Sequence, residues 1–168
     1  ISLDGVVVSS SIKVAGDDFD DAIVRFMRKR HNLLIGERSA EEIKINIGTC
    51  YKRPENISMD IRGRNLVTGL PSEVTVNGSE IHDALSEHFQ SIVDNIKIIL
   101  ERTPPEISAD IYKSGVYITG GSSRIKDLGK FIYDQIGLRV NLCEEPESTV
   151  IIGLGSIIED PQLAKLTL

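Results

Sequence analysis

The chain has 168 residues, of which 40% are hydrophobic and 26% are charged, a composition typical of a soluble globular protein rather than a disordered or fibrous one. Its 19 Lys and Arg stand against 25 Asp and Glu, giving a net charge of −6, so nucleic acid is not expected as the main partner. No apolar run approaches the roughly 18 residues that a membrane-spanning helix needs.

The first residues predict a hairpin followed by a helix. Apolar and small polar residues alternate over residues 1–14, and the Asp4-Gly5 pair is typical of a tight turn between antiparallel strands. From Phe19 onward, apolar residues recur every three or four positions, and Arg28–Arg30 place positive charge late in the pattern. This arrangement predicts an amphipathic helix over residues 19–30, with its charges matched to the helix dipole.

Two more helices and a strand-rich segment are expected next. Ser39 and Glu42 have the spacing of a capping box, which predicts a helix that begins there. Residues 57–77 alternate again between glycine-containing breaks, which predicts short strands. Ser79 is the expected N-cap of a long helix. That helix must end by Thr103–Pro105, because proline is not tolerated in a helix interior.

The last third of the chain alternates between strand and helix patterns, which is typical of an α/β fold. The expected elements are a short helix from Pro105, a strand at Val116–Thr119, a helix at Ile125–Ile136, a strand at Leu138–Leu142 and a final helix at Ser148–Glu159.

Few residues favour metal or covalent chemistry. Cys50 and Cys143 have no nearby thiol or histidine cluster, so neither a zinc site, a disulfide nor a catalytic cysteine is expected, and a reducing cytoplasm is indicated. The three histidines are scattered over two predicted helices. The chain begins at Ile1 with no basic leader and no initiator methionine, so we expect no signal peptide and a start internal to a larger protein.

Two local patterns could bind a ligand. Gly120 and Gly121 join a predicted strand to a predicted helix, where glycine permits close approach and free amides face an anionic or polar group. The alternative is an ordinary strand-to-helix turn. Glu41 and Lys44 are three residues apart and share a helix face. They either point at one ligand or form a solvated ion pair.

Gly16 could also admit a ligand, because it lies between the predicted hairpin and the first helix. The acids that follow it, Asp17, Asp18 and Asp20, are most simply explained as stabilising the helix start, and Phe19 as a core residue.

Six segments are informative in their order along the chain: Gly16–Asp20, Ile35–Lys44, Ile61–Pro71, Thr103–Glu106, Ile118–Gly121 and Glu144–Pro146. Together they resemble the MreB family of bacterial actin homologues, over about residues 1–160. The most specific part is Gly63–Pro71, Gly-Arg-Asn-Leu-Val-Thr-Gly-Leu-Pro, which other members of the actin and chaperone ATPase superfamily lack.

The resemblance implies the second half of an actin-like ATPase, an α/β, ribonuclease-H-like fold with a β-sheet flanked by helices and a small inserted α+β subdomain. Subdomain IIA is expected at residues 1–34 and 106–160, the inserted subdomain IIB at residues 35–105, and a tail at residues 161–168. The final helix, residues 148–160, is expected to pack on the first half of the family's fold. In this chain its apolar face would be uncovered, which favours self-association.

The resemblance also implies a nucleotide-binding site. Gly16 is expected near the sugar, while Glu41 and Lys44 reach the ribose and adenine from one side and the Gly-Gly-Ser turn closes from the other. The turn departs from the family and is closer to the adenosine motif of heat-shock chaperone ATPases. Arg124 is therefore a candidate adenine contact, with a solvated arginine as the alternative. The expected nucleotide-binding residues are Gly16, Glu41, Lys44, Gly120, Gly121, Ser122 and Arg124.

The family's phosphate loops, its Mg²⁺-associated acid and the residue that positions the attacking water would all precede Ile1. No catalytic or metal-binding residue is therefore expected in this chain. The full-length protein is expected to bind ATP or ADP with Mg²⁺ and to be a slow ATPase. The 168-residue chain alone is expected to bind nucleotide weakly at best and to be inactive.

Two main classes of function, and a third without nucleotide binding, are compatible with the sequence. In the first, the parent protein is a cytoskeletal subunit that binds ATP, forms filaments with itself and determines rod cell shape by organising wall synthesis. It would work with cell-shape and wall-synthesis proteins in the cytoplasm, at the inner face of the membrane, which it contacts through its other half. In the second, the chain is part of a heat-shock-chaperone-like or sugar-kinase-like ATPase domain. Residues 63–71 favour the first. A relic that no longer binds nucleotide is a third reading.

Overall fold

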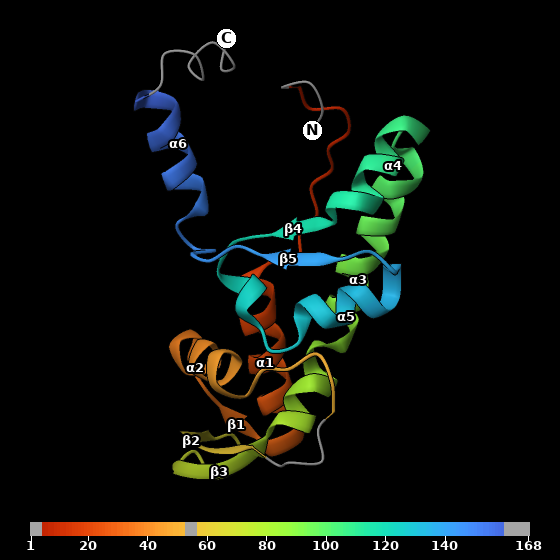
Figure 1. Ribbon diagram of the computed structural model, residues 1–168. Helices are drawn as coiled ribbons and strands as arrows, with labels where there is room; N and C mark the ends of the chain where they lie inside the picture. Colours follow the sequence, from red (N-terminus) through yellow and green to blue (C-terminus); the bar gives the residue numbers. More distant parts are fainter. Residues whose placement is uncertain (1–4, 53–56, 160–168) are drawn as a thin grey trace.

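The computed structural model describes residues 5–52 and 57–159, and its strands lie in two separate sheets (Figure 1). An antiparallel sheet in the order β1-β2-β3 contains β1 (Leu33–Leu34), β2 (Ser58–Asn65) and β3 (Pro71–Asn77). A parallel pair contains β4 (Val116–Ile118) and β5 (Val140–Leu142). The helices are α1 (Gly16–His31), α2 (Glu37–Ile47), α3 (Gly78–Arg102), α4 (Pro105–Ser114), α5 (Leu128–Ile136), α6 (Thr149–Glu159) and the short 3₁₀ helix η1 (Gly121–Arg124).

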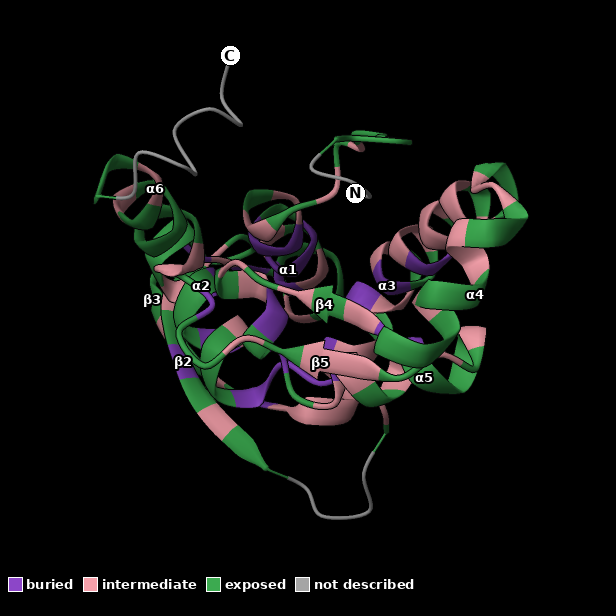
Figure 2. Ribbon diagram, turned by 45° about the horizontal axis from the view of Figure 1, so that its top comes forward, coloured by how far each residue is buried: buried purple, intermediate pink, exposed green. Residues whose placement is uncertain are grey.

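One hydrophobic core joins α1, α3 and α5, each of which turns apolar residues inward at three- or four-residue spacing. The Phe19 and Phe89 rings meet edge to face with centroids 5.7 Å apart, and Phe131 follows at 6.2 Å from Phe89. Figure 2 shows buried residues on α1 and α3, whereas α4 and α6 contain none. The buried members on the three core helices are Phe19, Ala22, Ile23, Met27, Ile81, Leu85, Phe89, Val93, Leu128 and Ile132.

The β2–β3 hairpin confirms the strands predicted within residues 57–77. Gly63 is required where β1 passes, because a Cβ at this position would lie 2.5 Å from the Leu34 carbonyl oxygen. The side chain of Asn65 then closes the turn by accepting hydrogen bonds from the amides of Val67 and Thr68, an arrangement for which asparagine is favoured. The Gly63–Pro71 segment thus forms the end of β2 and the turn that leads to β3, and both Gly63 and Asn65 have specific structural roles in it.

β3 and β4 belong to different sheets. The subdomain boundaries expected near residues 35 and 105 remain a prediction. One hydrophobic core includes residues from before, between and after these boundaries, so the core does not divide the chain at either of them. Phe19, Ile43 and Ile132 belong to the same cluster although they come from the three different segments.

Two predicted helix caps are wrong, because α2 and α3 both begin before them. α2 begins at Glu37 after Gly36, whose carbonyl accepts from the amide of Ala40, so Ser39 lies inside the helix rather than at its cap. The N-cap of α3 is Asn77 and not Ser79. Asn77 exchanges hydrogen bonds with Glu80 in a capping box, which satisfies two amides that would otherwise lack partners.

The predicted N-terminal hairpin is wrong for the part that the structure describes. Residues 6–14 form no strand, and Val6 is 70% exposed. A two-stranded hairpin is marginal in water unless it packs on other elements, and this stretch buries little against the rest of the chain. The expected turn at Asp4 lies outside the described residues.

The final helix is found where it was predicted, as α6. It extends away from the core, beyond the β4–β5 pair (Figure 1). Its apolar side chains are exposed, with Val150 and Ile151 at 67% and Ile158 at 83%. An apolar surface of this kind is typical of an association face.

Candidate functional site

A cavity of about 450 Å³ lies where α1, α2, η1 and the segment after β5 meet. Its volume falls in the range of sites that hold small molecules. Six of the seven residues predicted to bind nucleotide line it, although they come from distant parts of the sequence. The lining residues are Gly16, Asp17, Asp20, Glu41, Lys44, Ile45, Gly121, Ser122, Arg124, Ile125 and Glu147.

Gly16 is the point at which the walls converge. It is the first residue of α1, and a Cβ there would lie 3.5 Å from both the Lys44 Nζ and the Ser122 Oγ. The amide of Ala15, just before the helix, donates to the Asp18 carboxylate at 2.9 Å, so Asp18 stabilises the helix start as expected. The two sides of the predicted site therefore come together across Gly16.

Lys44 does not pair with Glu41, which corrects the ion pair considered from the sequence. Its Nζ donates to the Asp20 Oδ2 at 2.8 Å and to the Gly16 carbonyl at 3.2 Å. The Lys44 and Asp20 side chains are only 11% and 13% exposed, whereas Glu41 stays exposed. A partly buried pair is screened less by water than an i,i+3 pair on a helix surface, which is why this partner is favoured.

Asp20 also lines the cavity, although its position in the sequence predicted only a role at the helix start. The signal for its burial was present in the spacing, because Asp20 lies three residues before Ile23 and seven before Met27, both fully buried. These three side chains share one face of α1. An acid on a core-facing stripe needs a charged partner, and Lys44 supplies it.

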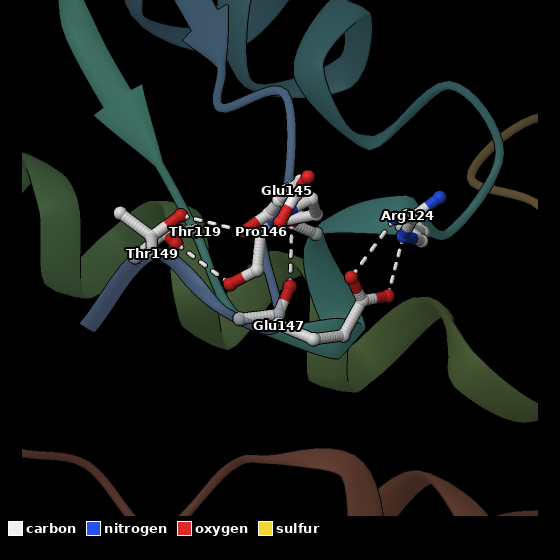
Figure 3. A network of polar contacts seen from close by, with 8 residues as sticks. Thr119, Arg124, Glu145, Pro146, Glu147 and Thr149 are labelled. Atoms are coloured by element: carbon white, nitrogen blue, oxygen red, sulfur yellow. Dashed lines mark hydrogen bonds and ion pairs between the residues drawn. The ribbon is translucent and has the colours of Figure 1, made fainter. Parts of the chain in front are cut away.

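Gly120 has a backbone role and is not among the lining residues. Its φ of +87° suits glycine, and its amide donates to the Pro146 carbonyl at 2.7 Å. The Thr119 hydroxyl donates to the same carbonyl at 2.9 Å (Figure 3). These bonds tie the Gly-Gly turn to the segment that leads into α6.

Glu147 holds the guanidinium of Arg124 by two contacts (Figure 3). Both side chains are exposed and both residues line the cavity. The Arg124 Nη2 donates to the Glu147 Oε2 at 2.9 Å, and the Arg124 Nε contacts Oε1. The hydrogen bond lowers the pKa of Glu147 and raises that of Arg124. The two-point contact orients the guanidinium plane, although the pair is too exposed to contribute much to stability.

The balance of charge indicates what kind of ligand fits. Four acids line the cavity, and only Lys44 and Arg124 oppose them: Asp17, Asp20, Glu41 and Glu147. Carboxylates accept hydrogen bonds and repel anions. The cavity therefore suits a ligand group that presents hydroxyl and amino donors, and it does not suit a phosphate chain.

Other chemistry finds little support in the part of the chain that the structure describes. No group of three or more His, Cys, Asp or Glu side chains there could hold a metal ion. Burial, followed by the charge of Asp127, raises the pKa of the Cys50 thiol to about 12, which makes it a poor nucleophile.

None of the described helices combines the length and apolarity needed to cross a bilayer.

Comparison with known proteins gives the family. Residues 1–166 match the family model described as MreB/Mbl protein. The chain is 43% identical to the cell shape-determining protein Mbl of Bacillus subtilis over 160 residues, covering 95% of the chain and 48% of that protein. It is 40% identical to the cell shape-determining protein MreB of Escherichia coli, covering 95% and 46%. The chain spans about half the length of these relatives.

Solved structures give the fold. The chain superposes on MreB5 of Spiroplasma citri bound to ADP with a TM-score of 0.87 and 37% identity, over 91% of the chain and 46% of that protein. A MamK double helical filament structure matches with a TM-score of 0.76 over 89% and 46%, but at 20% identity it supports the fold alone. The predicted actin-like α/β fold is confirmed by these neighbours. With the family model matching nearly every residue, the chain belongs to the MreB/Mbl family of bacterial actin homologues.

Proposed function

We propose that this chain forms the adenosine side of a nucleotide cleft in an ATP-binding, filament-forming actin homologue that determines rod cell shape. The observation that carries the proposal is the 450 Å³ cavity, which gathers Gly16, Lys44, Ser122 and Arg124 from three segments of the sequence. The sequence alone predicts that these residues bind nucleotide, and their convergence on one cavity supports one shared ligand.

The chemistry of the walls suits a nucleoside. Ribose hydroxyls and an adenine amino group can donate to the exposed carboxylates of Asp17 and Glu41. The Lys44 ammonium, with two of its three hydrogens already used, keeps one for a ribose oxygen. The oriented plane of Arg124 suits stacking against a base. Because the cavity is rich in carboxylates, the phosphates and Mg²⁺ are assigned to the rest of the protein.

The neighbours support the same ligand. Structures of MreB5 of Spiroplasma citri were solved with ADP and with AMPPNP, and this chain matches both at 37% identity. By the same likeness we assign the chain to the nucleotide-binding half made of subdomains IIA, at residues 1–34 and 106–160, and IIB, at residues 35–105. A heat-shock-chaperone-like or sugar-kinase-like role is the alternative, and the family match disfavours it.

Self-association is the second part of the proposal. The match to the MreB/Mbl family supports self-association, and the exposed apolar α6 offers a contact surface. Partners among wall-synthesis proteins, a place at the inner face of the membrane and slow ATP hydrolysis belong to the full-length protein in this proposal.

Titration calorimetry distinguishes the proposed function from that of a family member that no longer binds nucleotide. The full-length protein is expected to bind ATP, while the 168-residue chain binds it weakly and without turnover, because each charge-assisted phosphate contact it lacks is worth about 1.5–3 kcal/mol. Adding adenosine should then compete with ATP for the full-length protein. If ATP binds but adenosine never competes, or if no nucleotide binds at all, the adenosine assignment is wrong.

A further inference from the structure

Asp20 is a buried carboxylate that the proposed function does not yet use. It lies on the core-facing stripe of α1, one turn after Gly16, and only 9% of the residue is exposed. Burying a carboxylate is unfavourable unless it is paired, and a core position would be more stable with an apolar side chain. Its presence on this stripe therefore calls for a role beyond packing.

The contacts of Asp20 are one-sided. Its Oδ2 accepts from the Lys44 Nζ at 2.8 Å, while its Oδ1 is buried with no hydrogen-bond partner among the described residues. Buried polar atoms without partners are rare in native proteins. One oxygen of Asp20 is thus left unsatisfied and the other is used by Lys44. This arrangement indicates that Asp20 serves to fix the position of the Lys44 ammonium more than to stabilise the fold.

Lys44 needs such control, because its ammonium sits on a flexible four-carbon chain. Glu41 lies one turn earlier on the same face of α2 and is exposed, so it is a competing partner for the ammonium. Asp20 and the Gly16 carbonyl together draw the ammonium away from the helix surface and hold it at the wall of the cavity.

We propose that Asp20 is the positioning residue of this site: it holds the Lys44 ammonium beside Gly16, so that its remaining N–H faces the ribose of the bound nucleotide. The inference rests on the proposed function for the identity of the ligand. Asp20 acts through Lys44 and makes no contact with the nucleotide itself.

A double-mutant cycle in the full-length protein tests this inference, with ATP affinity measured by calorimetry. Asp20→Ala is expected to weaken ATP binding about tenfold, the loss typical of one hydrogen bond to a charged group. Asp20→Asn, which keeps an acceptor oxygen, should recover part of that loss. Because Asp20 acts through Lys44, the double variant Asp20→Ala/Lys44→Met should bind ATP no more weakly than Lys44→Met alone.

Asp21→Asn is the matched control, since Asp21 is the next residue of α1 and is exposed. It removes the same charge and should leave ATP affinity unchanged. If the losses from Asp20→Ala and Lys44→Met multiply in the double variant, Asp20 has only a general structural effect and the inference fails. Wild-type affinity in Asp20→Ala would overturn it as well.

A second measurement needs no nucleotide, and so separates failure of this inference from failure of the proposed function. Lys44 in the native protein should react slowly with an amine-acylating reagent, as followed by mass spectrometry, because its ammonium is paired and 11% exposed. Asp20→Ala should speed acylation of Lys44 about tenfold and leave the exposed Lys29 unchanged. Equal Lys44 rates in the two proteins would show that Asp20 does not hold it.

Discussion

Removing Lys44 tests whether its pair with Asp20 behaves as a buried ion pair. Lys44→Met keeps most of the side-chain volume but leaves the Asp20 carboxylate without its charged partner. Breaking a buried pair in this way costs about 3–5 kcal/mol. Since both side chains keep slightly more than a tenth of their surface exposed, we expect the lower end, about 3 kcal/mol of the free energy of unfolding.

The measurement is urea unfolding of the chain at neutral pH. Lys29→Met, on the exposed side of α1, is the control and should change the free energy of unfolding by less than about 1 kcal/mol. Replacing both partners, as Asp20→Leu/Lys44→Met, should restore stability to within about 1 kcal/mol of the native chain, because no charge is then left buried. A loss below about 1 kcal/mol for Lys44→Met alone would refute the reasoning, since the pair would then behave as a surface pair.

Three further outcomes are expected. Arg124→Ala should weaken ATP binding to the full-length protein about tenfold with no loss of stability, because its pair with Glu147 is exposed; unchanged affinity would leave Arg124 as a surface residue. Truncation after Glu147 should reduce self-association in light scattering, since it removes the exposed α6, and a chain that is monomeric with or without α6 would contradict this. Native-state alkylation at pH 8 should modify Cys143 and spare the buried Cys50, whose pKa of about 12 is raised from 9.0. The folded state prefers the protonated Cys50 thiol, so the burial of this thiol contributes fully to stability below pH 9, and the contribution is lost as the pH rises from about 9 to about 12. A free energy of unfolding that stays constant over this range would contradict the raised pKa of Cys50.

The sequence predicted helices and strands well where local spacing decides them. The helix of residues 19–30 and the long helix before Thr103 follow from apolar periodicity, and both are present as α1 and α3. The caps were less accurate: Ser79 has the right residue type, but Asn77 is better placed to exchange hydrogen bonds with Glu80. The choice depends on where β3 ends, which local spacing does not specify.

The site was predicted in part for a similar reason. Residue type and resemblance pointed to Lys44 and to the Gly-Gly turn, but the i,i+3 spacing offered only Glu41, on the same helix, as an ion-pair partner for Lys44. The actual partner, Asp20, is 24 residues away in sequence and is brought close only by the packing of α1 against α2. The Arg124–Glu147 pair likewise joins residues 23 apart, because strand β5 returns beside β4.

The most direct test of the adenosine site is a structure of the full-length protein with bound ADP. The proposed function predicts the ribose beside Gly16 and Lys44, and the adenine in the cavity between α2 and η1, within reach of Arg124. The phosphates should point away from the four carboxylates that line the cavity. An ADP molecule whose base and ribose lie outside this cavity, or whose phosphates fill it, would contradict the proposal.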